Sequence, residues 1–199
     1  QSNANFTVLN RIIPTDVAGI PTLRQIALNG NITSRITGLA SLPGGNVWFY
    51  SPGGILVGAN SVINVGSLVL TSRDIDTTGG LFGSAGEIRF RDPPLAGAGN
   101  SVVRIAPGAQ INGQTGNSYI ALVAPRVEQA GFINANGSVA LVAAEQADVT
   151  VHQGLFDINI LVGSDDPNGI VHTGYTGGTP VNSPLYSQRV YMVAVPKNQ

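Results

Sequence analysis

Acidic side chains are the groups through which this chain could hold a metal ion or move a proton, and Asp and Glu together number 11. Most of them stand alone in the sequence. Asp74 and Asp76 alternate beside Arg73 in an extended stretch, so both carboxylates would point to one side and could bind a cation or a sugar. We favour a solvated turn for this pair. We favour a turn also for Asp165 and Asp166, because Asp is common in turns.

The remaining reactive side chains form no catalytic pattern. His152 and His172 are the two histidines, and neither has a His or a carboxylate at metal-ligand spacing. Cysteine is absent, which excludes a disulfide, a thiol nucleophile and a thiolate metal site. Trp48, Phe49 and Tyr50 could offer rings to a sugar, but in a strand Phe49 would face away from the other two, so at least one side lies in the core. We therefore expect no enzyme activity, no cofactor and no metal site.

The composition limits the class of protein. Charged residues make up only 11% of the 199 residues, and there are 26 Gly and 12 Pro, which argues against long surface helices and coiled coils. The net charge is −1 and the basic residues are scattered, so we expect no nucleic-acid partner. With 43% hydrophobic residues and a mean hydropathy of +0.19, the chain can bury enough surface to fold.

Short apolar runs closed by Gly, Asn, Asp, Ser or Pro recur along the chain, as in a protein of many short strands. The clearest runs are residues 47–50, 55–57, 62–65, 68–71, 102–105, 119–123 and 139–142. Residues 118–124 resemble 138–144 at an offset of 20, and 111–113 resemble 133–135 at an offset of 22. A strand-based period near 20 predicts a right-handed parallel β-helix, in which Asn side chains can stack along the axis. Leucine-rich repeats are the nearest alternative, but their Leu-x-x-Leu-x-Leu pattern is missing.

Two segments interrupt this pattern. Residues 10–24 contain two prolines around a polar stretch, which predicts a loop that leaves the solenoid and returns. Residues 156–175 contain apolar runs at 158–162 and 170–173 on either side of an Asn-Gly pair, which predicts an extra-helical β-hairpin. We expect residues 1–199 to form a single β-helical domain.

The most specific stretch is residues 45–60, with the sequence GNVWFYSPGGILVGAN, followed by INVGSLV at 63–69. It resembles the haemagglutination-activity, or two-partner secretion, domain of filamentous haemagglutinin-like exoproteins. That family has an apolar strand, an Asn-Pro-Asn-Gly-Ile turn and an Ile-Asn-Val-Gly-Gly-Leu-Val strand. Residues 8–12, 34–38 and 127–148 are similar to further coils of the family. The resemblance covers most of residues 6–151.

The turn at Ser51, Pro52, Gly53, Gly54 and Ile55 departs from the family pattern, because Ser51 and Gly53 stand where Asn is usual. Pro at the second turn position and Gly at the third predict a type II turn, in which the third residue needs a positive φ. Ile55 would then begin the next strand.

The resemblance implies a secretion-signal and folding-template domain of a large secreted adhesin-like exoprotein, exported through the periplasm to the cell surface. Its partner would be an outer-membrane β-barrel transporter with periplasmic recognition domains. By the same resemblance, Asn10 and Arg11 together with the turn from Ser51 to Ile55 would carry recognition.

A structural protein is the alternative from another class. A surface filament or biofilm-matrix β-helix could self-associate by stacking coil ends, because open ends expose unpaired backbone groups. A carbohydrate-binding or carbohydrate-cleaving β-helix is a third, weaker interpretation. The first residues lack the regions of a signal peptide, and the last strand looks as though it continues, so we expect a piece of a longer exoprotein.

Overall fold

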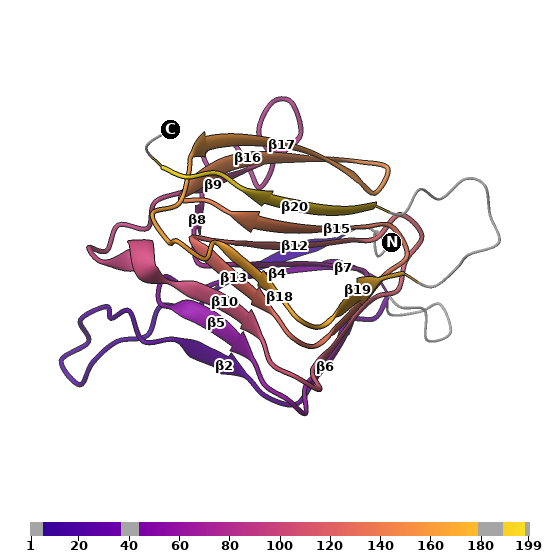
Figure 1. Cartoon of the computed structure of the whole chain (residues 1–199), viewed down its shortest axis with the longest axis horizontal. Coiled ribbons are helices and arrows are strands. Elements are labelled where there is room, and N and C mark those ends of the chain that lie inside the picture. The colour runs from indigo at the N-terminus through magenta and orange to yellow at the C-terminus, as the bar shows by residue number, and fades with distance from the viewer. Residues whose placement is uncertain (1–5, 37–43, 179–188, 198–199) are drawn as a thin grey trace.

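The computed structural model describes residues 6–36, 44–178 and 189–197, and these residues are mostly β-strands and turns. Figure 1 shows the strands stacked in layers along the molecule. A short 3-10 helix at Ala98–Asn100 is the one helical element in these ranges, and none of them holds a helix long and apolar enough to cross a membrane. Thr37 and Gly38, the end of the coil compared above as residues 34–38, lie outside the described residues.

Three parallel sheets form the body of the protein. The first sheet has the order β1-β4-β7-β12-β15-β20. Its strands are β1 (Thr7–Arg11), β4 (Asn46–Tyr50), β7 (Ser67–Thr71), β12 (Tyr119–Ala124), β15 (Ser138–Ala143) and β20 (Arg189–Ala194). We number the coils by these strands, so that β1, β4, β7, β12 and β15 begin coils 1 to 5.

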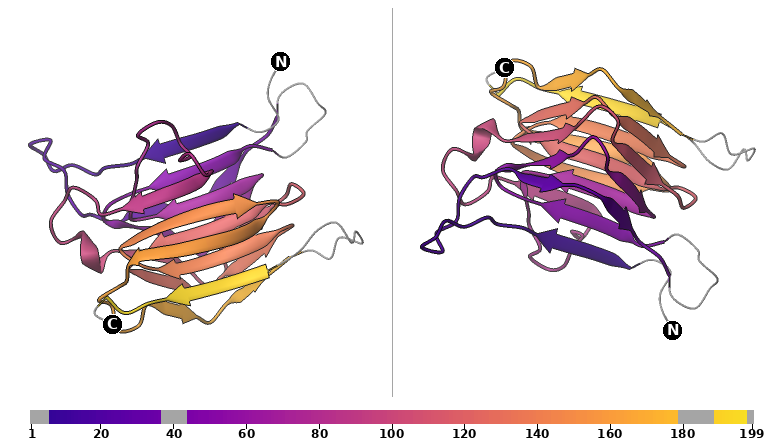
Figure 2. Two further views of the ribbon diagram at one scale, coloured as in Figure 1. Left: turned by 90° about the horizontal axis from the view of Figure 1, so that it is seen from above. Right: turned by 90° about the horizontal axis from the view of Figure 1, so that it is seen from below.

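The second and third sheets repeat the same coil order. The second sheet contains β2 (Ile26–Leu28), β5 (Gly54–Val57), β10 (Val102–Ile105), β13 (Arg126–Gln129) and β18 (Ile170–His172). The third contains β3 (Asn31–Thr33), β6 (Val62–Val65), β11 (Gln110–Gly113), β14 (Phe132–Ala135) and β19 (Tyr175–Gly177). Each coil visits the three sheets in turn, and Figure 2 shows the strands of successive coils side by side. The predicted parallel β-helix class is confirmed.

One hydrophobic cluster fills the space between the three sheets. It includes Phe49 from the first sheet, Ile55 from the second and Ile63 from the third, and the last two are 0% exposed. Inward side chains alternate with outward ones because successive residues of a strand face opposite sides. Burying a side chain of this size contributes about 1.5–3 kcal/mol, which makes the repeated inward Ile, Leu and Val the main source of stability.

A fourth, antiparallel sheet covers the outer face of the first. It has the order β17-β16-β9-β8 and consists of β8 (Asp74–Ile75), β9 (Glu87–Arg91), β16 (Gln146–His152) and β17 (Leu155–Val162). Trp48, Val69 and Val142 of the first sheet pack in a second cluster with Ile88 and Phe90 of the fourth. The central strands of the first sheet are therefore buried on both faces, which explains why all six residues of β12 and of β15 are buried.

The extra-helical hairpin is present, but its position differs from the prediction. β17 pairs with β16 around Gln153 and Gly154, both of which have positive φ. β18 pairs instead with β13 in the second sheet, in parallel. The Asn168-Gly169 pair suggested a hairpin turn, but neither residue has the positive φ that such a turn requires, so residues 165–169 only lead the chain back to the coil.

The register of the repeats is partly as expected. Ile111 lies beside Ile133, which confirms the offset of 22, and the Asn side chains of neighbouring coils stack on the third sheet as predicted. In the first sheet Tyr119 lies beside Ser138, an offset of 138 − 119 = 19 rather than 20. The one-residue difference matters because a slip of one residue exchanges the inner and outer faces of a strand.

Extra segments leave the coils at one corner, between the first and second sheets. Residues 12–25 do so in coil 1, β8 and β9 in coil 3, and β16 and β17 in coil 5. The expected loop at 10–24 begins later, because Asn10 and Arg11 still belong to β1. Coils 2 and 4 close the same corner with short turns at Pro52 and Pro125.

Candidate functional site

The two segments expected to carry recognition lie side by side at the corner of coils 1 and 2. β1 pairs with β4, so that Asn10 lies beside Phe49 and Arg11 beside Tyr50. The amide of Ile12 continues the ladder by donating to the carbonyl of Tyr50 at 2.8 Å. Since Ser51 follows Tyr50 directly, the end of β1 meets the start of the turn.

The side chains of Asn10 and Arg11 are both engaged in the folded protein. Asn10 Nδ2 donates to the carbonyl of Trp48 at 3.1 Å. The guanidinium of Arg11 pairs with the carboxylate of Asp74 and donates to the carbonyl of Ile75, and its Cζ lies 5.8 Å from the centre of the Tyr50 ring. Arg11 thus fastens coil 1 to the start of the fourth sheet.

Two residues next to this contact are buried: Tyr50, whose ring faces Arg11, and Arg73, which precedes Asp74. Each is 1% exposed. Burial, together with the charge of Asp74, raises the pKa of Tyr50 to about 12 although Arg73 and Arg11 act in the opposite direction. Burial also lowers the pKa of Arg73, while the negative charges of Asp92 and Glu145 oppose that shift.

Arg73 reaches the 3-10 helix of coil 3. Its Nη2 donates to the carbonyl of Ala98 and, at 2.8 Å, to Ser101 Oγ. Ser101 Oγ in turn donates to Ser72 Oγ at 2.8 Å. The guanidinium of Arg73, beside which a cation or sugar site was considered, is buried among protein acceptors.

The turn after β4 has a different geometry from the predicted type II turn. The amide of Gly54 donates to the carbonyl of Ser51 at 3.0 Å, which closes a four-residue turn. Positive φ occurs at Gly54, at +96°, and not at Gly53. Pro52 at the second position and glycine at the fourth are the preferences of a type I turn, so the residue that needs glycine's backbone freedom is the next one along.

The turn is packed against its neighbours along the stack. A Cβ on Gly53 would come within 2.3 Å of the carbonyl oxygen of Leu23, and one on Gly54 would come equally close to that of Val102. Ser51 and Ile55 are 0% exposed, and Ser51 Oγ has no hydrogen-bond partner among the described residues. A cavity of about 170 Å³ lies between Pro52 and residues 97–101.

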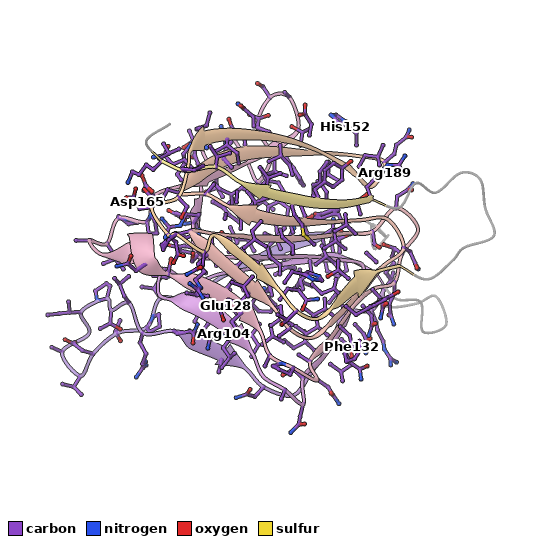
Figure 3. The ribbon with its side chains drawn as sticks, in the orientation of Figure 1. Arg104, Glu128, Phe132, His152, Asp165 and Arg189 are labelled. Atoms are coloured by element: carbon purple, nitrogen blue, oxygen red, sulfur yellow. The ribbon has the colours of Figure 1, made fainter. Side chains whose placement is uncertain are left out.

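The other candidate residues are dispersed over the molecule. Asp76 Oδ1 accepts from the amide of Thr78 at 2.9 Å, and this bond, with the charges of nearby arginines, lowers its pKa, as suits the solvated turn that we favoured. Asp166 accepts from the amide of Asn168 at 2.8 Å, which confirms the expected turn. His152 is exposed at the end of β16, and Figure 3 shows it far from Asp165.

Neither a metal site nor a sugar platform is found where the sequence offered one. Within the described ranges, no group of three or more His, Asp or Glu side chains could hold a metal ion. Trp48 is 0% exposed, and its Nε1 donates to the hydroxyl of Tyr119 at 3.0 Å. Trp48 and Phe49 belong to different clusters on opposite faces of the first sheet, as their alternation predicted.

Sequence reasoning missed Ile75 and Ser101, and it considered Arg73 and Asp74 as a separate site rather than as part of this corner. Their signal was weak because they come from coil 3, more than 60 residues from Arg11. An alignment of β4 with β7 would have shown that Arg73 and Asp74 follow the strand next to Tyr50.

The corner as a whole is a set of packed backbone turns whose polar side chains already bind each other. Residues 22–180 match the family model described as the TPS secretion domain, where TPS stands for two-partner secretion. No curated protein matches the chain in sequence. Because the match covers most of the chain and the fold is a parallel β-helix, this protein belongs to the TPS secretion domain family.

Proposed function

We propose that this chain is the secretion-signal and folding-template domain of a large adhesin-like exoprotein, and that residues 1–199 act as one unit in that role. Members of the family are exported by the two-partner pathway to the cell surface or the extracellular space, with an outer-membrane transporter as the general partner. We propose further that the periplasmic domains of that transporter recognise Asn10, Arg11 and the turn from Ser51 to Ile55, and that the domain has no catalytic task.

The burial of the turn is the observation that carries this proposal. Ser51, Pro52, Gly54 and Ile55 are buried, and Arg11 is held by Asp74. Arg11 stays partly exposed, but a partner could bind the buried residues of the turn only before the coils close over them. We infer that the transporter recognises the unfolded chain in the periplasm, and that folding after export buries the turn so that the transporter no longer binds it.

The template role is supported by the last coil. β18, β19 and β20 are the outermost strands of their sheets, and parallel strands can be added there. In β20, Val190 and Met192 continue the inward rows of Val139 and Leu141 but are 46% and 49% exposed. A following coil would bury them and form its backbone hydrogen bonds on a preformed edge, so each coil would guide the next.

Binding to the transporter tests the proposal. The chain, held unfolded in mild denaturant or folded in buffer, is titrated against the periplasmic domains of the transporter encoded beside its gene. We expect binding of the unfolded chain and weak or absent binding of the folded one. Replacing Pro52, Gly53 and Ile55 together with Ala should abolish binding of the unfolded chain.

A matched control exists in coil 3. Residues 106–109 form a second Pro-Gly turn, in which the amide of Ala109 donates to the carbonyl of Ala106 at 3.1 Å and Gly108 has a φ of +90°. Pro107→Ala should leave transporter binding unchanged. Equal loss of binding on changing either turn, or no binding by the unfolded chain, would count against the proposal.

A further inference from the structure

The outer face of the third sheet presents two straight rows of side chains. Outward and inward positions alternate in each of its strands, and inward Ile32, Ile63, Ile111 and Ile133 form the core side. The first outward row consists of Asn31, Val62, Gln110, Phe132 and Tyr175. The second row consists of Thr33, Asn64, Asn112, Asn134 and Gly177. None of these side chains carries a charge.

The second row is a ladder of amides. Asn112 Nδ2 donates to Asn64 Oδ1 at 2.9 Å, and Asn134 Nδ2 donates to Asn112 Oδ1 at 3.4 Å. An Asn amide has two N–H groups and two oxygen lone pairs, and one ladder bond on each side uses only one of each. Donors and acceptors therefore remain along the row, at the strand spacing of about 4.8 Å.

The first row ends in two exposed aromatic rings. Phe132 is 49% exposed and Tyr175 51%, and their ring centres are 6.4 Å apart with 38° between the planes. Tyr175 lies over Gly177, because a Cβ on that glycine would be 2.7 Å from the tyrosine hydroxyl. The ring thus takes the place of a side chain at the end of the amide row. Figure 3 shows Phe132 on the outside of the coils.

The other sheets offer no such surface. The outer face of the second sheet carries ions: Arg104 and Arg126 both pair with Glu128, and Arg126 also pairs with Asp166. Figure 3 places Arg104 and Glu128 together there. The outer face of the first sheet is covered by the fourth. Only the third sheet, among the described residues, combines neutral amides with exposed rings on an open face.

We propose that the outer face of the third sheet binds a neutral polysaccharide chain. Sugar rings have apolar C–H faces that pack on aromatic rings, and hydroxyl groups that both donate to and accept from amides. Phe132 and Tyr175 supply the aromatic rings for the C–H faces. Asn64, Asn112 and Asn134 supply the amides for the hydroxyl groups. The side chains of the two rows are all uncharged, so none of them would offset the desolvation of a sulfate or carboxylate, and this favours a neutral sugar over an anionic one.

Calorimetric titration of the 199-residue chain with cellohexaose, xylohexaose and maltohexaose tests this site, with a heparin hexasaccharide as the anionic comparison. We expect at least one neutral hexasaccharide to bind and the heparin fragment not to bind. Tyr175→Ala should raise the Kd about tenfold, the effect of losing one aromatic contact. Tyr175→Phe keeps the ring and should bind within a factor of about three of the original chain.

Two further variants separate binding from folding. Asn112→Ala removes the middle of the ladder and should also weaken binding, while Leu161→Ala removes a similarly exposed apolar side chain from β17 and should not. Unchanged circular dichroism and melting temperature show that each variant is folded. No binding of any neutral hexasaccharide at about 1 mM, binding of the heparin fragment alone, or unchanged affinity in Tyr175→Ala would overturn the proposal.

Discussion

Trp48 illustrates how a single side chain links two sheets. It lies between the first and fourth sheets, is 0% exposed, and packs edge-on against Phe82 with ring centres 5.2 Å apart. Its indole N–H has the hydroxyl of Tyr119 as acceptor. Burial raises the pKa of Tyr119 well above its usual value, although the hydrogen bond from Trp48 acts in the opposite direction. The phenol therefore stays neutral and keeps its role as acceptor across the physiological range.

Removing this acceptor should destabilise the protein. Tyr119→Phe leaves the buried indole N–H of Trp48 without a partner, which should lower the free energy of unfolding by about 1–3 kcal/mol. Urea denaturation followed by circular dichroism measures the change. Tyr175→Phe, at an exposed position, is the control and should change stability by less than about 0.5 kcal/mol. Equal effects of the two variants would contradict the assignment.

We expect Glu128 to make the free energy of unfolding depend on pH in the acidic range. Partial burial opposes its ionisation, but hydrogen bonds from Arg104 and Arg126 outweigh burial and hold the pKa of Glu128 below its ordinary value of 4.5. A carboxyl with a lowered folded pKa stabilises the protein fully above the unfolded pKa, and that contribution is lost as the pH falls through the folded pKa. Unfolding free energies should therefore decline below pH 4.5, and less steeply in Glu128→Gln. Parallel declines in both proteins would disprove the role of Glu128.

At the scale of the element, the turn between β4 and β5 depends on one backbone position. Gly54→Ala puts a side chain at a φ of +96° and against the carbonyl of Val102, whereas Gly79→Ala has a φ of +81° but nothing within 4 Å. The φ strain costs about 1–2 kcal/mol at either site. We expect urea denaturation to show that loss for Gly79→Ala and a clearly larger one for Gly54→Ala. Equal losses would mean that the close approach to Val102 has no energetic effect.

The positions of strands could be predicted from the sequence, but the pairing of segments that are far apart in the chain could not. Apolar runs bounded by turn residues located all three strands of coil 2 and the first-sheet strands of coils 3 to 5, because inward Ile, Leu and Val recur in each coil, but β13 and β19 fall in no such run. The echo between β12 and β15 was misaligned by one residue, since small apolar residues fill both faces when both are buried. The position of the hairpin was wrong because β16 and β17 are joined by Gln153 and Gly154, a pair with a weaker turn signal than Asn168-Gly169.

The recognition segments show the same limit. The sequence placed Asn10 and Arg11 in one family element and residues 51–55 in another, and parallel pairing of β1 with β4 brings them together. The burial of the turn could not be predicted, because Leu23 and Val102, which cover it, come from neighbouring coils.

At the scale of the whole molecule, the strands at the two ends of the first sheet expose apolar side chains. Val8 is 44% exposed on β1 and Met192 is 49% exposed on β20, at opposite edges of the first sheet. Self-association through such ends stays a prediction, which sedimentation at increasing protein concentration can test. If the ends associate, the molecular mass measured by sedimentation should rise with protein concentration. Met192→Lys should suppress this rise by placing a charge on the end face. A constant mass of 20.5 kDa for the original chain would contradict it.

The fourth sheet has a consequence for how this β-helix can evolve. A solenoid usually lengthens by duplication of a repeat, because each coil contacts only its neighbours. Here β9 of coil 3 pairs with β16 of coil 5. The extra segments of these two coils therefore meet across coil 4, which sets the distance between their coils. A coil gained or lost between them would separate Ala147 from Phe90 by one strand spacing, about 4.8 Å, and break the pairing. The pairing therefore opposes a change in repeat number between β9 and β16, in residues 92–145.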